Sequence, residues 1–253
     1  MRTPMVADGG AAAMSMALFR QIGTPRHGGI VLVADHAGNA VPDDMALGIA
    51  PELLERHIGI DIGVAGVAER MARFHEIPAH LACLSRLIVD LHREEDHEKL
   101  IPTHSDGHVI PGNIGADRTM RIARFYHPYH EALARWLEQA QPSLIISLHS
   151  FTPELASNPA ETRPWEVGLL YNRNEAPARR AIRLFEAQGL TVGDNQPYSG
   201  KLLNATMNRH AEAHGRDYLA IEVRQDQIAT AAGQQRWARL IAEVANGVAL
   251  RPA

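Results

Sequence analysis

The stretch that decides the fold is LIISLHSF, residues 144–151. Its continuous apolar run from Leu144 to Leu148 is typical of a strand buried on both faces of a mostly parallel sheet. Further runs of this kind lie at residues 29–34, 79–84, 86–91, 167–171 and 218–223. The sequence therefore predicts several buried strands that pair in one sheet.

Segments with apolar residues at helical spacing lie between these runs. They cover residues 51–74 as one or two helices, 117–140 with Pro128 inside, 176–188, 201–214 and 233–248. Strands that alternate with helices indicate a three-layer α/β/α sandwich with a mixed, mostly parallel sheet. We expect residues 1–20 to form a flexible leader and residues 21–253 to form a single domain.

Composition excludes several classes of partner. The net charge is -4, from 25 basic and 29 acidic residues, which favours neither nucleic acid nor an anionic membrane. The apolar runs are too short to span a bilayer, and the N-terminus lacks the apolar core of a signal peptide. The single cysteine, Cys83, allows no internal disulfide. We expect a cytoplasmic protein.

Two long polar connections follow directly on predicted strands. Residues 94–116 and 151–165 are too long for ordinary connections, and loops of this length are often functional or disordered. In open α/β folds, ligands bind at the carboxyl ends of the strands. These two segments are therefore expected to wall a binding site.

Histidines stand at the ends of two predicted strands. His36 lies in Asp35-His36-Ala37-Gly38-Asn39, and His149 follows Leu148. Each segment alone is also compatible with a polar turn or a hydrogen-bonded cap. Two such imidazoles on two strands favour a shared metal site, for which zinc is a suitable ion.

Two other strands carry charged residues in suggestive positions. Glu222 and Arg224 lie two apart, so they form either a structural ion pair or a site with Glu222 as its base. In the segment that begins with the run at 86–91, Arg86, Asp90 and His92 share a strand face by parity, and Arg86 is either paired with Asp90 or turned to a ligand. Arg93, just past that run, is the better candidate for binding a carboxylate, because its guanidinium presents a planar fork of donors.

Together these segments resemble the N-formylglutamate amidohydrolase family. The resemblance extends from about residue 29 to residue 226. It is carried by residues 35–39, 85–86 with 90–93, 149–151, 197–199 and 221–226. The family in turn is distantly similar to zinc carboxypeptidases and aspartoacylases, which implies a phosphorylase/hydrolase-like fold and a hydrolase domain.

The resemblance also implies roles for individual residues. His36 and His149 become metal ligands, with Asn39 or, instead of it, Asp61 as the third, and Glu222 becomes the general base. The implied substrate-binding residues are Arg93, Arg86, His92, Arg224 and Tyr198. Two positions depart from the pattern of the related metal enzymes: Asn39 stands where they have an acidic ligand, and His92 where they have Asn.

The expected activity is therefore metal-dependent hydrolysis of an amide in a small substrate that bears a carboxylate, such as N-formylglutamate. One alternative is an amidase or peptidase that acts on another N-acylated substrate. The other is a non-catalytic binding protein that has lost its metal.

Overall fold

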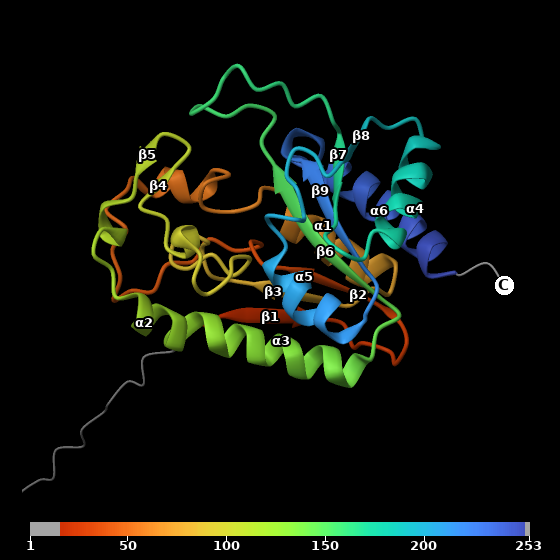
Figure 1. The fold of residues 1–253 in the computed structure, drawn as a ribbon, viewed down its shortest axis with the longest axis horizontal. Helices are drawn as coiled ribbons and strands as arrows, with labels where there is room; N and C mark the ends of the chain where they lie inside the picture. Colours follow the sequence, from red (N-terminus) through yellow and green to blue (C-terminus); the bar gives the residue numbers. More distant parts are fainter. Residues whose placement is uncertain (1–15, 251–253) are drawn as a thin grey trace, which may run out of the picture.

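The computed structural model of the protein describes residues 16–250, and its centre is a seven-stranded sheet (Figure 1). In spatial order the strands are β1 (Phe19–Ile22), β3 (Ala79–Ala82), β2 (Ile30–Ala34), β6 (Leu144–Phe151), β9 (Tyr218–Arg224), β7 (Val167–Leu170) and β8 (Val192–Asp194).

The sheet is mixed and mostly parallel, as predicted. Strands β3, β2, β6 and β9 run in one direction, and β7 and β8 run in the other. Strand β1 pairs antiparallel with β3. The four strands of common direction therefore bring their carboxyl ends to one edge of the sheet, where the predicted site residues stand.

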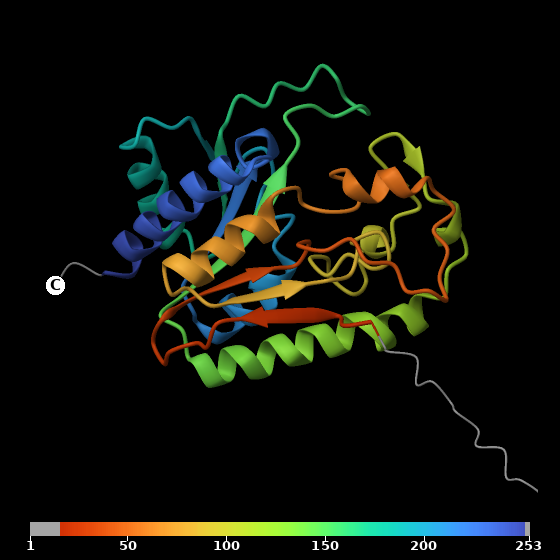
Figure 2. The same ribbon diagram turned by 180° about the vertical axis from the view of Figure 1, so that it is seen from behind.

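Helices cover both faces of the sheet and confirm the three-layer sandwich (Figures 1 and 2). One face carries α1 (Val64–Phe74), α4 (Ala176–Glu186) and α6 (Ala231–Ala249). The other carries α3 (His127–Ala140) and α5 (Ala205–His210). A short α2 (Arg118–Arg121) and a π-helical turn (Ile122–Tyr126) lead into α3. Pro128 has no N–H to donate to the preceding turn. The wider π-helical turn just before it accommodates the missing hydrogen bond, so the helix continues past the proline.

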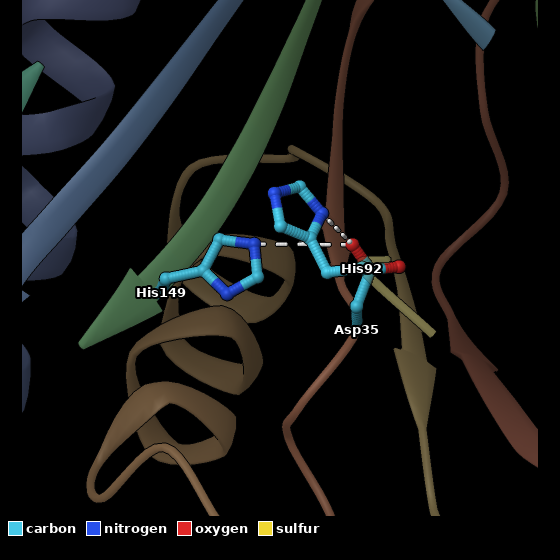
Figure 3. A group of neighbouring side chains, drawn as sticks. All are labelled: Asp35, His92 and His149. Atoms are coloured by element: carbon cyan, nitrogen blue, oxygen red, sulfur yellow. Dashed lines mark hydrogen bonds and ion pairs between the residues drawn. The ribbon is translucent and has the colours of Figure 1, made fainter. Parts of the chain in front are cut away.

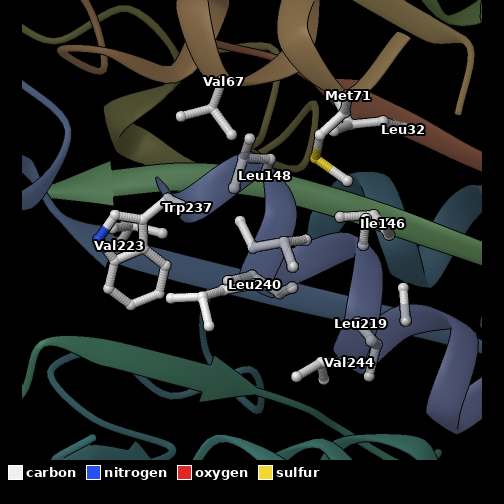
Figure 4. Close-up of a cluster of buried hydrophobic side chains, with 14 of the residues drawn as sticks. Leu32, Val67, Met71, Ile146, Leu148, Leu219, Val223, Trp237, Leu240 and Val244 are labelled. Carbon is white, nitrogen blue, oxygen red and sulfur yellow. The ribbon is translucent and has the colours of Figure 1, made fainter. Parts of the chain in front are cut away.

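Alternation along the strands divides the apolar residues between two cores. In β6, Ile146 and Leu148 face α1 and α6, where they pack with Val67, Trp237 and other large side chains (Figure 4). Ile145 faces the opposite core, which contains residues of α3 such as Leu133. The polar residues Ser147 and His149 share the parity of Ile145, so they lie on the α3 face.

One predicted strand is wrong. Residues 86–91 form a turn and an extended loop, although Leu87, Ile88 and Val89 are fully buried. The backbone N–H of Ile88 donates to Ser85 O, and that of Asp90 donates to Leu100 O. This segment is therefore buried beneath its neighbours without pairing in the sheet, and Arg86, Asp90 and His92 do not share a strand face.

The two long polar segments were correctly placed as loops. Residues 94–116 contain the short 3₁₀ helices Glu98–Leu100 and Pro111–Asn113 and a hairpin of β4 (His104–Ser105) and β5 (His108–Val109). In the segment predicted at 151–165, Phe151 is the last residue of β6, and residues 152–166 contain no helix or strand.

The segment predicted as helix at 51–74 consists of a 3₁₀ helix, Pro51–Glu55, followed by α1. Another 3₁₀ helix, Glu212–His214, follows α5, and a further one, Gln225–Gln227, follows β9. In the leader prediction, residues 1–15 lie outside the described residues, and β1 begins at Phe19.

No helix in residues 16–250 has the length and apolar character to cross a bilayer.

Candidate active site

Three buried side chains meet at the carboxyl edge of the sheet. His36 follows β2, Asp61 lies in the loop before α1, and His149 lies near the end of β6. Asp61 Oδ2 lies 3.4 Å from His36 Nδ1 and 2.9 Å from His149 Nδ1. These atoms are close enough together to share one metal ion.

The state of His36 shows that the group suits a cation. Its Nδ1 is buried without a hydrogen-bond partner among the described residues. Its Nε2 lies 2.8 Å from Asp90 Oδ1 and donates to it, so a metal ion would bind at Nδ1, in place of a proton. Burial and Arg86 disfavour protonation, yet Asp90 and Asp61 raise the pKa of His36 to about 9. The surrounding carboxylates thus require positive charge at this point, which a metal ion would supply.

The carboxylate of Asp35 contacts two histidines of the site, His92 and His149. Asp35 Oδ2 lies 3.0 Å from His92 Nδ1 and 3.8 Å from His149 Nε2 (Figure 3). The Tyr129 hydroxyl donates to Asp35 Oδ1 at 2.7 Å, and His92 Nδ1 also lies 3.1 Å from the Thr206 hydroxyl. Because Asp35 and His92 are already paired with each other and with these hydroxyls, they fit the role of orienting groups better than that of ligands.

Glu222 faces the same region from β9. In the parallel register it stands beside His149, on the same face of the sheet. Its Oε2 is buried and has no hydrogen-bond partner within the described residues. Burial, reinforced by the negative charge of Asp61, raises the pKa of Glu222 to about 8. A desolvated carboxyl group of this kind is suited to accept and return a proton near neutral pH.

Two arginines stand beside the acidic cluster. Arg86 donates to Asp61 Oδ1 at 3.1 Å and to Asp90 Oδ2 at 2.8 Å, so its predicted pairing with Asp90 forms. Arg93 Nε lies 3.6 Å from Asp90 Oδ2. Arg86 is thus held by two carboxylates, whereas Arg93 has the single ion pair with Asp90 and is the freer cation for a ligand.

These groups line one cavity of about 270 Å³. Its walls come from the ends of β6 and β9 and from both long loops. They include His36, Asp61, His149, Glu222, Arg86, His92, Arg93 and Tyr198. Most of the predicted site residues therefore surround one space.

Two predicted site residues lie elsewhere. The Asn39 amide donates to Leu54 O at 3.3 Å and to Glu55 Oε1 at 2.8 Å, which turns it away from the histidines. Asp61, the alternative to Asn39, instead lies beside His36 and His149. Arg224 pairs with Asp226 at 2.8 Å and donates to the backbone of residues 163–165. It therefore neither pairs with Glu222 nor lines the cavity.

Sequence reasoning missed Arg163, whose side chain is 2% exposed. Its guanidinium donates to the Tyr198 hydroxyl at 3.1 Å and to Thr152 O at 3.2 Å, and so fixes Tyr198 at the cavity wall. No local pattern marked it, because it lies in a loop without periodicity. The role of Asp90 as the partner of His36 was also missed, although its buried position beside Arg86 was a usable signal.

Two histidines and two buried carboxylates gather at the carboxyl edge of this three-layer α/β sandwich, an arrangement suited to a hydrolytic enzyme. Residues 28–229 match the N-formylglutamate amidohydrolase family. The chain belongs to this family, and it is a hydrolase that acts on amide C–N bonds.

Two solved structures share the fold. A gene product of Agrobacterium tumefaciens is 26% identical, with a TM-score of 0.85 over 91% of this chain and 94% of that chain. N-formylglutamate amidohydrolase from Ralstonia eutropha JMP134 is 22% identical, with a TM-score of 0.73 over 92% of this chain and 98% of that one. The comparison with curated proteins found no match.

Proposed function

We propose that the protein is a zinc-dependent amidohydrolase that removes the N-acyl group of a small acidic amino-acid derivative such as N-formylglutamate. The observation that carries the proposal is the convergence of His36, Asp61 and His149 on one point, with the unpartnered carboxyl of Glu222 in the same cavity. Two imidazoles and one carboxylate are a ligand set typical of catalytic zinc, which keeps a fourth position open.

The ligand atoms in this proposal are His36 Nδ1, Asp61 Oδ2 and His149 Nδ1. Asp90 holds His36 in the required orientation through its 2.8 Å contact with Nε2. A bound zinc ion would supply a Lewis acid that polarises the scissile carbonyl and acidifies water. Arg86, which donates to Asp61 and Asp90, keeps those two carboxylates in place.

Glu222 is proposed to act as the general base and then as the general acid. Its carboxylate accepts a proton from the attacking water and delivers it to the nitrogen of the leaving amine. Burial excludes bulk water from Glu222, so that proton stays in the site. For N-formylglutamate the products are formate and glutamate.

Arg93 is proposed to bind the substrate carboxylate. Its side chain lines the cavity and is 18% exposed, so its guanidinium is accessible to a ligand. A planar guanidinium suits bidentate recognition of a carboxylate. Lys99 lines the same cavity and adds positive charge for an acidic substrate.

The test is an activity screen of chelator-treated protein, with and without added zinc. The substrates are N-formyl- and N-acetyl-glutamate and -aspartate, with N-formylleucine as the substrate without a side-chain carboxylate. We expect zinc to restore hydrolysis and acidic substrates to be preferred, and we expect Arg93→Ala to reduce that preference.

The same screen separates the alternatives. Activity on N-formylleucine but on none of the acidic compounds would indicate an amidase or peptidase for another N-acylated substrate. A folded protein that binds no metal and hydrolyses none of these amides would be a non-catalytic binding protein, and the proposal would fail.

A further inference from the structure

A single carboxylate joins the two loops that cover the cavity. Asp106 and Gly107 form the turn of the β4–β5 hairpin, with φ of 41° and 82°. Positive φ at both central positions is typical of a type I′ turn, for which Asp-Gly is a favoured pair. The loop at residues 152–166 extends from β6 to the hairpin (Figures 1 and 2).

Asp106 accepts hydrogen bonds from two segments outside its own hairpin. Its Oδ1 accepts from the Ser157 backbone N–H at 2.8 Å and from the Ser157 hydroxyl at 2.7 Å. Its Oδ2 accepts from the Ala156 backbone N–H at 3.1 Å and lies 2.9 Å from His57 Nε2, which donates to it. The hairpin, the long loop and the segment before α1 are therefore fastened at one side chain, which is only 6% exposed.

The ionisation of Asp106 agrees with this geometry. Burial alone would raise its pKa, but the hydrogen bonds from Ser157 and Ala156 lower the pKa to about 2. The carboxylate is therefore charged at neutral pH, and charge-assisted hydrogen bonds of this kind are stronger than neutral ones.

A second cavity, of about 430 Å³, is also lined by Asp106 and His57. It shares His57, Asp106, Thr152 and Leu155 with the candidate active site. These side chains stand between the two cavities. Release of the Asp106 contacts would free the loop and open the candidate active site towards the second cavity.

We propose that Asp106 is a specificity-determining residue that limits substrate length, because it holds two loops closed over the cavity and keeps the second cavity apart from it. The inference rests on the proposed amidohydrolase function. The closed arrangement accepts a small N-acyl amino acid and excludes amides extended on the acyl or the amine side.

The test uses the zinc-loaded enzyme and Asp106→Asn. Asparagine tolerates the left-handed turn, but its Nδ2 would face N–H donors, so the contacts to Ala156 and His57 are lost. We would measure kcat/KM for N-formylglutamate, N-butyrylglutamate and N-formylglutamyl-alanine. In the variant, kcat/KM for at least one extended substrate, relative to that for N-formylglutamate, should rise by about tenfold, the lower end of what one methylene is worth in a pocket.

The matched control is Asp44→Asn, which makes the same chemical change at an exposed ion pair with Arg124. It should leave the substrate ratios at the wild-type values. Ser157→Ala, which removes one donor to Asp106, should shift the ratios in the same direction as Asp106→Asn but less.

Hydrogen exchange gives a readout that does not depend on turnover. The amides of Ala156 and Ser157 should exchange faster in Asp106→Asn than in wild type. Unchanged exchange, or unchanged substrate ratios in a folded variant, would overturn the inference.

Failure of the proposed function has a different signature. If the wild-type holoenzyme hydrolyses none of these amides, length selection is measured by calorimetric binding of the same three compounds. Asp106→Asn must then gain affinity for an extended compound relative to N-formylglutamate, and an unchanged affinity ratio would overturn the inference on its own.

Discussion

Glu222 combines two properties that a purely structural carboxylate rarely has. It is buried in a strand, and one of its oxygens lacks a hydrogen-bond partner among the described residues. An unpaired buried carboxyl costs free energy that folding alone does not recover. We therefore propose that its position beside His149 serves the reaction rather than the stability of the fold.

At the scale of single residues, we predict that Glu222→Gln binds zinc as the wild type does. Its kcat should fall by about a hundredfold or more, because the amide cannot accept the proton. Metal analysis and steady-state kinetics on N-formylglutamate measure the two quantities. The control is Asn39→Ala, which removes a side chain that points away from the site and should retain both metal and activity. Full turnover in Glu222→Gln would assign Glu222 a structural role.

The sequence predicted that His36 and His149 lie at the sheet edge, because a strand that ends in a polar residue exposes that residue there. The third position of the group was harder to predict. Asn39 has the spacing of the related metal enzymes, but the residue that lies beside His36 and His149 is Asp61, in a loop before α1 with no motif around it. Only the tertiary path of residues 56–63 brings Asp61 to His149.

At the scale of elements, the loop after β2 is pinned to the segment after β3. Ala40 N–H donates to Cys83 O at 3.0 Å, and Ser85 N–H donates to Ala40 O at 2.9 Å. A Cβ on Gly38 would lie 2.2 Å from Cys83 O, which no real side chain tolerates. Gly38 thus permits the close approach that carries the loop containing His36 across the sheet edge.

We predict that Gly38→Ala lowers the free energy of unfolding by about 2–3 kcal/mol, because the clash is with backbone that cannot move aside. Urea unfolding of metal-free protein measures the change. Gly189→Ala is the comparison: its φ is 81°, but the space around it is open, so only the left-handed penalty of about 1 kcal/mol applies. Equal losses in the two variants would contradict the steric argument.

The strands of the sheet interior were predictable because their apolar runs are continuous, as in β6 and β9. The same signal failed at residues 86–91, where Leu87, Ile88 and Val89 are as buried as any strand. Periodicity reports burial and does not say which backbone groups pair, so a buried loop and a buried strand look alike. Strand β1 was missed for the opposite reason, since its middle residues are exposed.

At the scale of the whole molecule, His80 links the stability of the fold to pH. It is fully buried in β3, stacks on Phe19 at 4.6 Å and contacts Tyr129 and Trp136. Burial lowers the pKa of His80 from its usual 6.5 to about 4. The unfolded chain therefore binds a proton below pH 6.5 that the folded protein refuses until about pH 4.

Because of this difference, the free energy of unfolding falls as the pH falls from 6.5 to 4. His80 alone accounts for a loss of about 3 kcal/mol. We predict that His80→Phe, which keeps an aromatic ring in the cluster, reduces this part of the pH dependence. Urea unfolding of chelator-treated protein between pH 7 and 4 measures it. Identical slopes for the variant and the wild type would show that His80 is not the linked group.

The reversal of direction between β9 and β7 has a consequence for how this fold can change. Strand β6 ends, and β7 begins, at the same edge of the sheet. The chain between them never has to travel back along the domain, so the whole of residues 152–166 is available as a wall for the cavity. Insertions or replacements in that span can reshape what the enzyme accepts while every strand keeps its register.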